Sequence, residues 1–208
     1  MMPPDDLAAG CHAAVLLAAE RGRAATGAAL VRREDPRSRR RDGPCGHRIS
    51  ALRDPCDDVY VAFVPDDFRP PLGLVADQFV LEPLGPEHNE ADHEAWSSSI
   101  EHIRATPGFP DGRWPRPMTL DENRADLERH ARDFAARSGF TYTVLDPSDR
   151  AVIGCVYIYP DNDGAADAVV TSWVRATHAG SDAALRELVS RWLVEAWPFE
   201  HVSYAGPA

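Results

Sequence analysis

Apolar runs separated by short polar turns, a pattern typical of β-strands, mark the second half of the chain. Residues 140–146, 151–160 and 166–174 are rich in β-branched and aromatic side chains, and short turns separate them. Shorter runs of the same kind lie at 79–84 and 199–205. These patterns predict three consecutive antiparallel strands, with one strand before them and one after them.

Three other segments place apolar side chains three or four residues apart, which predicts amphipathic helices. The first helix is expected from Pro86 to about Arg104, because proline is favoured in the first turn of a helix. The segment 105–118 that follows holds four prolines and two glycines and is expected to be a loop. The expected inner face of the first helix carries Asp92, Trp96, Ile100 and Ile103.

A capping box predicts the start of the second helix, because Thr119 can accept a hydrogen bond from the amide of Glu122, whose side chain can reach back. This helix is expected to end before Gly139 and the third to end at Pro198. A strand, a helix and a strand in succession imply a right-handed crossover, so strands 166–174 and 199–205 are expected to be parallel neighbours. The expected inner stripes are Leu120, Leu127, Ala131, Phe134 and Ala135 in the second helix, and Leu185, Leu188, Val189, Trp192 and Leu193 in the third.

The first part of the chain has a different character. Residues 1–57 combine an Ala-rich segment with a charged stretch that proline and glycine interrupt, so a flexible, partly helical extension is expected. Residues 58–208 are expected to form one domain, which opens on a strand-like run at 59–64.

Charge narrows the choice of partners. All 22 basic residues are Arg, and the formal net charge of the chain is −11. Residues 58–208 alone carry 12 Arg against 25 Asp and Glu, which gives a net charge of −13. Phosphate contacts need basic clusters, so nucleic acid is not expected as a partner, and a neutral or cationic small molecule fits better.

Cysteine spacing and hydropathy exclude several further classes. Cys11, Cys45, Cys56 and Cys155 form no CxxC pair, so neither a disulfide framework nor a metal site is predicted. No apolar run approaches the roughly 18 residues of a membrane span. The apolar segment 11–19 follows acidic rather than basic residues, unlike a signal peptide. We therefore expect no membrane association and a cytoplasmic location.

The order strand, helix, helix, three strands, helix, strand over residues 79–205 resembles the front part of the GCN5-related N-acetyltransferase (GNAT) fold. The segment "FVLEPLGPEHNEADHEAW" is similar to the first strand and helix of many such domains, and "AVIGCVYIYP" is similar to their third strand. The resemblance implies an α/β (α+β) domain with a mixed, mostly antiparallel sheet flanked by helices. It would lack the family's usual last helix, which often supplies a tyrosine that protonates the leaving thiolate, and its last strands.

The same resemblance places the acyl-CoA loop at "SWVRATHAGSDAAL", residues 172–185. Members of the family hold the pantetheine arm on backbone groups of a strand and the pyrophosphate on amides at a helix N-terminus, where free N–H groups attract anions. The resemblance thus implies acetyl-CoA as co-substrate. The cofactor-binding residues that it implies are Trp173, Val174, Arg175, Gly180, Ser181 and Ala183.

This loop departs from the family pattern of Gln or Arg, two residues, Gly, one residue, and Gly or Ala. The pattern falls on Ala179, Asp182 and Ala184, and only the last position matches. A carboxylate in the first turn stabilises a helix by using the same amides and field that a phosphate would use. Ser181 and Asp182 therefore also fit an ordinary N-cap. Arg175 either contacts a phosphate or pairs with Asp182.

Acetyl transfer to an amine requires a group that takes a proton from the amine. Glu101 and His102 lie at the end of the first predicted helix, beside the aromatic loop, and are the candidate catalytic residues. A Glu–His pair on the surface is the alternative. Trp96, Trp114 and Tyr157 are the candidate substrate-binding residues for a cationic amine, with packing in the core as the alternative.

Two functions remain open at this point. The first is an acyl-CoA-dependent N-acetyltransferase that acts on an unidentified small-molecule amine, and the strand–helix order and the aromatic loop favour it. The second is a GNAT-like domain without catalysis that binds a small ligand or a protein partner, and the departures in the loop and at the C-terminus favour it. The last predicted strand would lie exposed at a sheet edge, which leaves a homodimer open.

Overall fold

The computed structural model describes residues 62–109 and 113–205. The predicted N-terminal extension, residues 1–57, lies outside these ranges, and so do the three cysteines that belong to it. The division into an extension and a domain that starts at residue 58 therefore stays a prediction.

The strand-like run at 59–64 is described only from residue 62, and residues 62–64 form no strand. The apolar side chains of this segment face inward instead. Val64 is buried, and the ring of Phe63 stacks on Phe140 with 5.7 Å between the ring centres. The prediction of a strand at these residues was wrong, because their apolar side chains pack against the core while their backbone pairs with no strand.

Six strands of the described chain form one sheet, in which they follow one another in sequence order. Neighbouring strands are antiparallel, except that the last two are parallel, as expected. The first strand was not predicted, because two residues are too few to show an alternation. The strands are β1 (Leu74–Val75), β2 (Val80–Pro83), β3 (Phe140–Leu145), β4 (Val152–Pro160), β5 (Ala168–Val174) and β6 (Val202–Tyr204).

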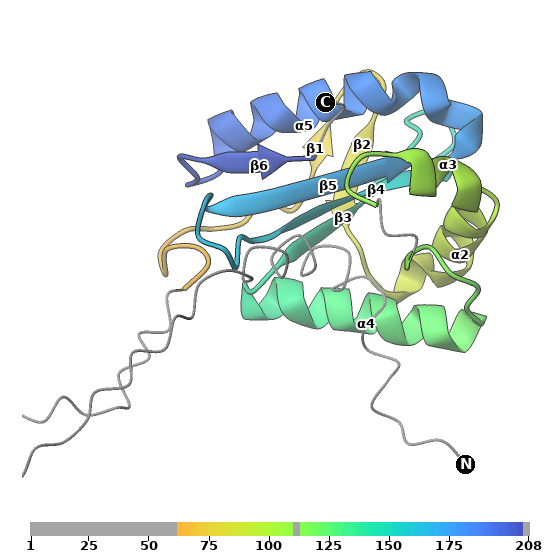
Figure 1. Cartoon of the computed structure of the whole chain (residues 1–208), viewed down its shortest axis with the longest axis horizontal. Helices are drawn as coiled ribbons and strands as arrows, with labels where there is room; N and C mark the ends of the chain where they lie inside the picture. The colour runs from red at the N-terminus through yellow and green to blue at the C-terminus, as the bar shows by residue number, and fades with distance from the viewer. Residues whose placement is uncertain (1–61, 110–112, 206–208) are drawn as a thin grey trace, which may run out of the picture. The chain divides into compact units, whose positions relative to one another are not determined.

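Helices cover both faces of this sheet (Figure 1). One face carries α5 (Asp182–Ala196), and the other carries α2 (Asn89–Ser97) and α4 (Leu120–Ala136). The short elements are η3 (Pro86–His88) before α2, α3 (Ile100–Ala105) after it, and η4 (Ala176–Ser181) before α5. The chain thus has the mixed, mostly antiparallel sheet flanked by helices that was expected. No helix of the described residues is long and apolar enough to cross a membrane.

The sheet separates two apolar cores. The core towards α5 contains Leu185, Val189, Trp192 and Leu193, which confirms most of the inner stripe predicted for this helix. The core towards α2 and α4 contains several aromatic residues, among them Trp96 and Trp173. Full burial of one aliphatic side chain stabilises the fold by about 1.5–3 kcal/mol. The apolar stripe of α5 therefore holds this helix on the sheet.

The helix predicted from Pro86 to Arg104 is broken near its end. The hydroxyl of Ser98 donates a hydrogen bond to the carbonyl of Glu94 at 2.7 Å, and Ser99 leaves helical geometry with a φ of −132°. Serine competes with the backbone for hydrogen bonds in this way and favours helix ends. The break gives α3 a direction of its own, and Ile103 is then fully buried.

The capping box of α4 is confirmed: Oγ1 of Thr119 accepts from the amide of Glu122 at 3.2 Å, and Oε2 of Glu122 accepts from the amide of Thr119 at 2.6 Å. The inner stripe predicted for this helix was partly wrong. Leu120 is 45% exposed, whereas Asn123 and His130 are buried beside Leu127. Polar side chains occupy inward positions of α4, so apolar spacing alone could not identify its inner face.

Candidate functional site

The sheet opens at the end of the parallel pair. β6 pairs with β5 at Ala168–Val170, and the amide of Ala205 adds one hydrogen bond to the carbonyl of Val170 at 3.0 Å. β5 continues to Val174, so residues 171–174 have no strand beside them on this side within the described chain. Trp173 and Val174 have fully buried side chains, so they can offer a ligand only backbone groups.

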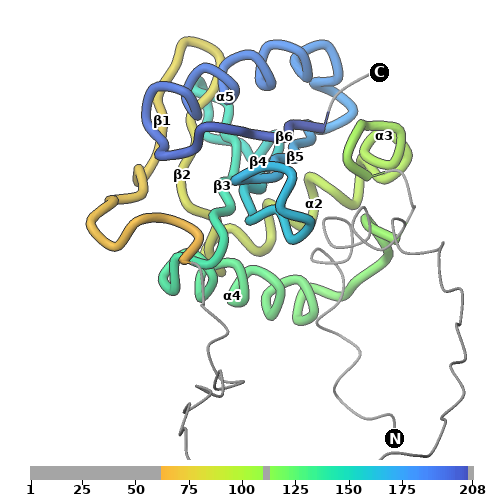
Figure 2. The backbone as a smooth tube through the Cα atoms, turned by 60° about the vertical axis from the view of Figure 1, so that its left-hand side comes forward, coloured from red at the N-terminus to blue at the C-terminus, as the bar shows by residue number. Residues whose placement is uncertain are grey.

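A cleft of about 350 Å³ lies at this opening. Figure 2 shows that α3 lies beside the ends of β5 and β6. The polar lining comes from three sides: His102 and Thr106 at α3, Ser172 on β5, and Asp182 and Arg186 on α5. The remaining lining residues are Ala105, Pro107, Ala183 and Ala205. The cleft therefore combines an apolar wall with hydroxyl, imidazole, carboxylate and guanidinium groups.

The first turn of α5, which follows η4 directly, forms one end of the cleft. Ser181 is the N-cap of α5, but its side chain makes no capping hydrogen bond. A Cβ added to Gly180 would meet open space, and its φ is not positive, so this position does not require glycine. Ala183 is exposed and lines the cleft. The first N–H groups of a helix have no intrahelical partner, so this end can attract an anion.

The carboxylate of Asp182 faces α3 instead of capping α5. Its Oδ2 lies 3.1 Å from Nε2 of His102, and it also accepts a hydrogen bond from the backbone N–H of Val174. Burial raises the pKa of Asp182, although the charge of His102 and these contacts oppose the rise. The N-cap expected at Ser181 is therefore right in position, but the expected side-chain cap is wrong: Ser181 makes no capping hydrogen bond, and Asp182 contacts other elements.

Arg175 does not pair with Asp182, and it is not a residue of the cleft. Its Nη2 donates to Oε1 of Glu94 at 3.0 Å, and the neighbouring amide of Ala176 donates to Oγ of Ser99 at 3.0 Å. These contacts join the turn after β5 to the corner between α2 and α3. Of the two alternatives for Arg175, the pairing with Asp182 was wrong, because Glu94 of α2 engages this guanidinium.

Arg186 of α5 forms hydrogen bonds with the end of β6. Its Nη2 donates to the carbonyl of Tyr204 at 2.7 Å, its Nη1 donates to the carbonyl of Ala205, and its Cζ lies 4.5 Å from the centre of the Tyr204 ring. The hydroxyl of Tyr204 donates to Oγ of Ser172 at 2.8 Å. Burial raises the pKa of Tyr204 to about 12, so the phenol stays protonated at neutral pH. These bonds hold one rim of the cleft.

Of the two predicted catalytic residues, His102 lies in the cleft and Glu101 does not. The side chain of His102 is 23% exposed, whereas Glu101 belongs to the exposed face of α3. Sequence reasoning did not connect His102 with Asp182, because they lie far apart along the chain and meet only through the packing of α3 against η4. The roles of Glu101 and His102 stay predictions.

The three predicted substrate-binding aromatic residues do come together, but in the interior. Trp96, Trp114 and Tyr157 are 1%, 3% and 6% exposed. The ring centre of Trp114 lies 6.2 Å from that of Tyr157 and 5.9 Å from that of Trp173. None of these residues lines the cleft described above. The structure shows these three residues packed in the interior, and their part in amine binding stays a prediction.

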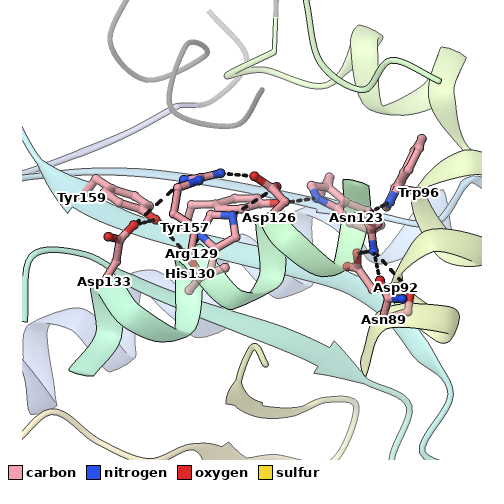
Figure 3. Close-up of polar contacts among 12 residues, drawn as sticks. Asn89, Asp92, Trp96, Asn123, Asp126, Arg129, His130, Asp133, Tyr157 and Tyr159 are labelled. Carbon is pink, nitrogen blue, oxygen red and sulfur yellow. Dashed lines mark hydrogen bonds and ion pairs between the residues drawn. The ribbon is translucent and has the colours of Figure 1, made fainter. Parts of the chain in front are cut away.

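The interface of α2, α4 and β4 is polar in part (Figure 3). Nδ2 of Asn123 donates to Oδ2 of Asp92 at 3.1 Å, and Oδ1 of Asn123 accepts from Nε1 of Trp96 at 2.9 Å. Asp92 is 4% exposed. Burial raises its pKa to about 6, although the hydrogen bond from Asn123 opposes the rise. A carboxyl group that titrates near neutral pH is thus built into the inner face of α2.

A second polar group lies further along α4 in Figure 3. Nδ1 of His130 lies 2.8 Å from the hydroxyl of Tyr159, and Nε2 lies 3.6 Å from Oδ2 of Asp126. Arg129 also contacts Asp126. Burial would raise the pKa of Asp126, but His130 and Arg129 outweigh it and lower the pKa. α4 is therefore joined to the sheet by hydrogen bonds as well as by apolar packing.

The described residues offer no group of three His, Cys, Asp or Glu that could hold a metal ion. Cys155 is a free thiol in the interior, and burial raises its pKa well above its usual value. A buried, protonated thiol is a poor nucleophile. The cleft at the end of β5 is therefore the better candidate site.

No protein-family model matches the sequence, and no curated protein matches it. Solved structures of acetyltransferases do resemble its fold. The ribosomal-protein-S5-alanine acetyltransferase from Vibrio fischeri is 11% identical, with a TM-score of 0.48 over 61% of this chain and 69% of its own. A GNAT-family acetyltransferase from Bordetella pertussis is 20% identical, with a TM-score of 0.41 over 58% of this chain and 72% of its own.

A third similar structure is the microcin C7 self-immunity acetyltransferase, in complex with acetyl-CoA and AMP. It is 13% identical, with a TM-score of 0.46 over 62% of this chain and 71% of its own. The fold thus resembles solved acetyltransferase structures, as the GNAT resemblance of the sequence had predicted. At these identities and TM-scores it carries no argument about activity, which has to come from the cleft itself.

Proposed function

We propose that this protein is an acyl-CoA-dependent N-acetyltransferase that acts on a small-molecule amine. The observation that supports the proposal most is the cleft of about 350 Å³ between the unpaired end of β5 and the first turn of α5. An acyl-CoA is a thioester with a peptide-like arm and a pyrophosphate. It needs an extended backbone edge for the arm and an anion site for the phosphates, and the cleft is lined by Ser172 of β5 and by Asp182 and Ala183 in the first turn of α5.

The backbone at the end of β5 suits an acyl-CoA better than the carboxylate of Asp182 at the start of α5 does. The backbone of Trp173 and Val174 would hold the arm, and the start of α5 would face the phosphates, although the amide of Asp182 already donates to the carbonyl of Ala179. Asp182 fits poorly, because its carboxylate already takes the N–H of Val174. Two like charges about 4 Å apart repel by about 1 kcal/mol in water and by about 4 kcal/mol near a protein surface. Acyl-CoA binding is therefore expected to be weak.

The charge of the chain supports an amine as the acceptor. Residues 58–208 carry a formal net charge of −13, and a field of this sign attracts cations to the surface. An amine must lose its proton before it can attack a thioester. His102, whose imidazole lines the cleft, is the group proposed to take a proton from the amine.

The proposal is tested by thermal unfolding of the full chain with acetyl-CoA and with desulfo-CoA. A ligand present at about 100 times its dissociation constant adds about 2.7 kcal/mol to the free energy of unfolding. Both ligands are expected to raise the melting temperature, because both carry the arm and the phosphates. No shift at millimolar concentration would contradict the proposal.

Two matched variants locate the binding site. Ala183 is exposed and lines the cleft, so Ala183→Phe is expected to fill it and to abolish the shift. Ser190 is exposed on the same helix outside the cleft, so Ser190→Phe is expected to preserve the shift. Equal shifts in both variants would mean that the ligand binds elsewhere.

The carboxylate of Asp182 favours a second function, a GNAT-like domain without catalysis that binds a small ligand or a protein partner. A carboxylate in the first turn of α5, seated on the N–H of Val174, occupies groups that an acyl-CoA would need. This reading predicts no thermal shift with acetyl-CoA or desulfo-CoA. The same titration therefore decides between the two functions.

A further inference from the structure

We infer that Asp182 and His102 act as an acid–base dyad, in which Asp182 orients the imidazole so that Nδ1 of His102 accepts the proton of the attacking amine. The inference rests on the proposed function and adds to it a positioning residue for the base. It also gives a chemical reason for a carboxylate where a phosphate-binding turn would have glycine.

The geometry of the pair supports this assignment. Nε2 of His102 is buried, lies 3.1 Å from Oδ2 of Asp182 and has no hydrogen-bonded partner in the described part of the chain. The two atoms are within hydrogen-bonding distance, although their alignment falls short of a regular hydrogen bond. Contacts of this kind in active sites often tighten only in the substrate complex. With Nε2 directed at Asp182, Nδ1 is the ring nitrogen that remains to accept a proton, and His102 lines the cleft.

No neighbouring charged side chain other than His102 pairs with Asp182 among the described residues. Arg186 lines the same cleft, but its guanidinium donates to the carbonyls of Tyr204 and Ala205. Tyr204 is the other titratable group near Asp182, and it is a neutral phenol at neutral pH. On the β5 side, the carboxylate meets the backbone N–H of Val174. The imidazole of His102 is therefore the side-chain partner of this carboxylate.

The fold holds the two residues in this arrangement from both sides. Asp182 is the first residue of α5, directly after η4. The hydroxyl of Ser99 at the start of α3 accepts a hydrogen bond from the amide of Ala176 at the start of η4, at 3.0 Å. The helix break at Ser98 and Ser99 thus fixes α3 against η4. His102 lies one turn beyond this anchor, which directs its ring to Asp182.

The amine loses its ammonium proton to solvent before it attacks, and from the neutral amine onward the dyad accounts for each proton of the transfer. The nitrogen of the amine attacks the thioester carbonyl carbon, the new C–N bond forms, and the C–S bond breaks to release the thiolate. Nδ1 of His102 accepts the amine proton, and the carboxylate of Asp182 stabilises the resulting imidazolium. The imidazolium then gives the proton to the thiolate, which yields the amide and free CoA thiol and restores neutral His102.

The experiment reads the protonated ring nitrogen of His102 from its nitrogen chemical shifts, in the isotope-labelled full chain at a pH where the imidazole is neutral. The wild type is expected to carry the proton on Nε2. Asp182→Ala is expected to lose this preference, and Asp182→Asn is expected to keep it, because an amide oxygen still accepts the bond. A proton on Nδ1 in the wild type, or a preference that survives in Asp182→Ala, would overturn the dyad.

The catalytic part is measured as acetyl transfer from acetyl-CoA to two probe amines, n-butylamine and spermidine. General base catalysis contributes about 10²–10⁴ in rate, so His102→Ala is expected to lose at least about 100-fold and Asp182→Ala at least about 10-fold in kcat. KM for acetyl-CoA is expected not to rise in Asp182→Ala, because a negative charge leaves the cleft. Glu187→Gln, which removes an exposed carboxylate of the same helix, serves as the matched control.

The outcomes separate the inference from the proposed function. If acetyl-CoA stabilises the chain and is turned over while Asp182→Ala transfers acetyl at the wild-type rate, the dyad is wrong and the proposed function stands. If acetyl-CoA does not stabilise the chain, or binds without transfer to either amine, the transferase is wrong and the proton-accepting role falls with it. The chemical shifts still decide whether Asp182 orients the ring.

Discussion

Replacement of Asp92 by asparagine is expected to stabilise this protein at neutral pH, because the change removes a charged side chain from its interior. Asp92 is 4% exposed, and burial raises its pKa to about 6 from an ordinary 3.8. Above the folded-state pKa the carboxyl is charged in a place where charge is unfavourable. Asparagine has the same shape and keeps an oxygen that can accept the hydrogen bond from Asn123.

The magnitude follows from the two pKa values. One pKa unit corresponds to about 1.4 kcal/mol, so a rise from 3.8 to about 6 is a difference of about 3 kcal/mol. The folded state binds the proton more tightly than the unfolded state. The contribution of Asp92 to stability is therefore fully present below about pH 4 and is lost as the pH rises through about 6. Carboxyl groups that do not interact with Asp92 are the same in both proteins and cancel in the difference, whereas the charge of Asp126 contributes to the raised pKa of Asp92.

The assay is urea unfolding of the wild type and Asp92→Asn at a series of pH values from about 4 to about 7. The stability of the variant relative to the wild type is expected to increase by about 3 kcal/mol across this range. Asp77→Asn makes the same change at an exposed position and controls for the loss of one carboxylate. A difference between wild type and Asp92→Asn that stays constant with pH, or falls, would refute the account of Asp92 as a buried, proton-binding group.

Two further substitutions test the local packing. Thr119→Ala removes the side-chain half of the capping box of α4 and is expected to lower the free energy of urea unfolding by about 1 kcal/mol; no loss would mean that water replaces this cap. A Cβ at Gly154 would lie 2.3 Å from the carbonyl oxygen of Trp173, so Gly154→Ala is expected to push β4 and β5 apart. The expected loss is about 1–3 kcal/mol in the same assay, and wild-type stability would show that the strands yield freely.

Most of the strands and one long helix could be predicted from local pattern. The apolar, β-branched and aromatic runs became β3, β4 and β5, because strands that are covered on both faces of a sheet need apolar side chains along most of their length. The inner stripe of α5 was readable for the matching reason in a helix, and the capping box marked the start of α4. The helix break at Ser99 was not predicted, since a serine pair is compatible with both a helix and its end.

The candidate site was predicted only in outline. The resemblance pointed to the turn after β5, but local sequence could not show that Arg175 would be engaged by Glu94, or that Asp182 would turn away from its own helix to His102. The buried polar face of α4 was missed for the same reason, because Asn123 and His130 are acceptable inside only with hydrogen-bonding partners on α2 and β4.

The sequence by itself determined where β3, β4, β5 and α5 lie and which face of α5 turns inward, because these depend on the composition and spacing of a few neighbouring residues. The tertiary structure alone decided which polar groups are paired, since a buried carboxylate or imidazole depends on partners that packing brings from distant segments. The cleft belongs to this second class: β6 ends early, α3 bends away from α2, and Asp182 and His102 meet at the opening that remains.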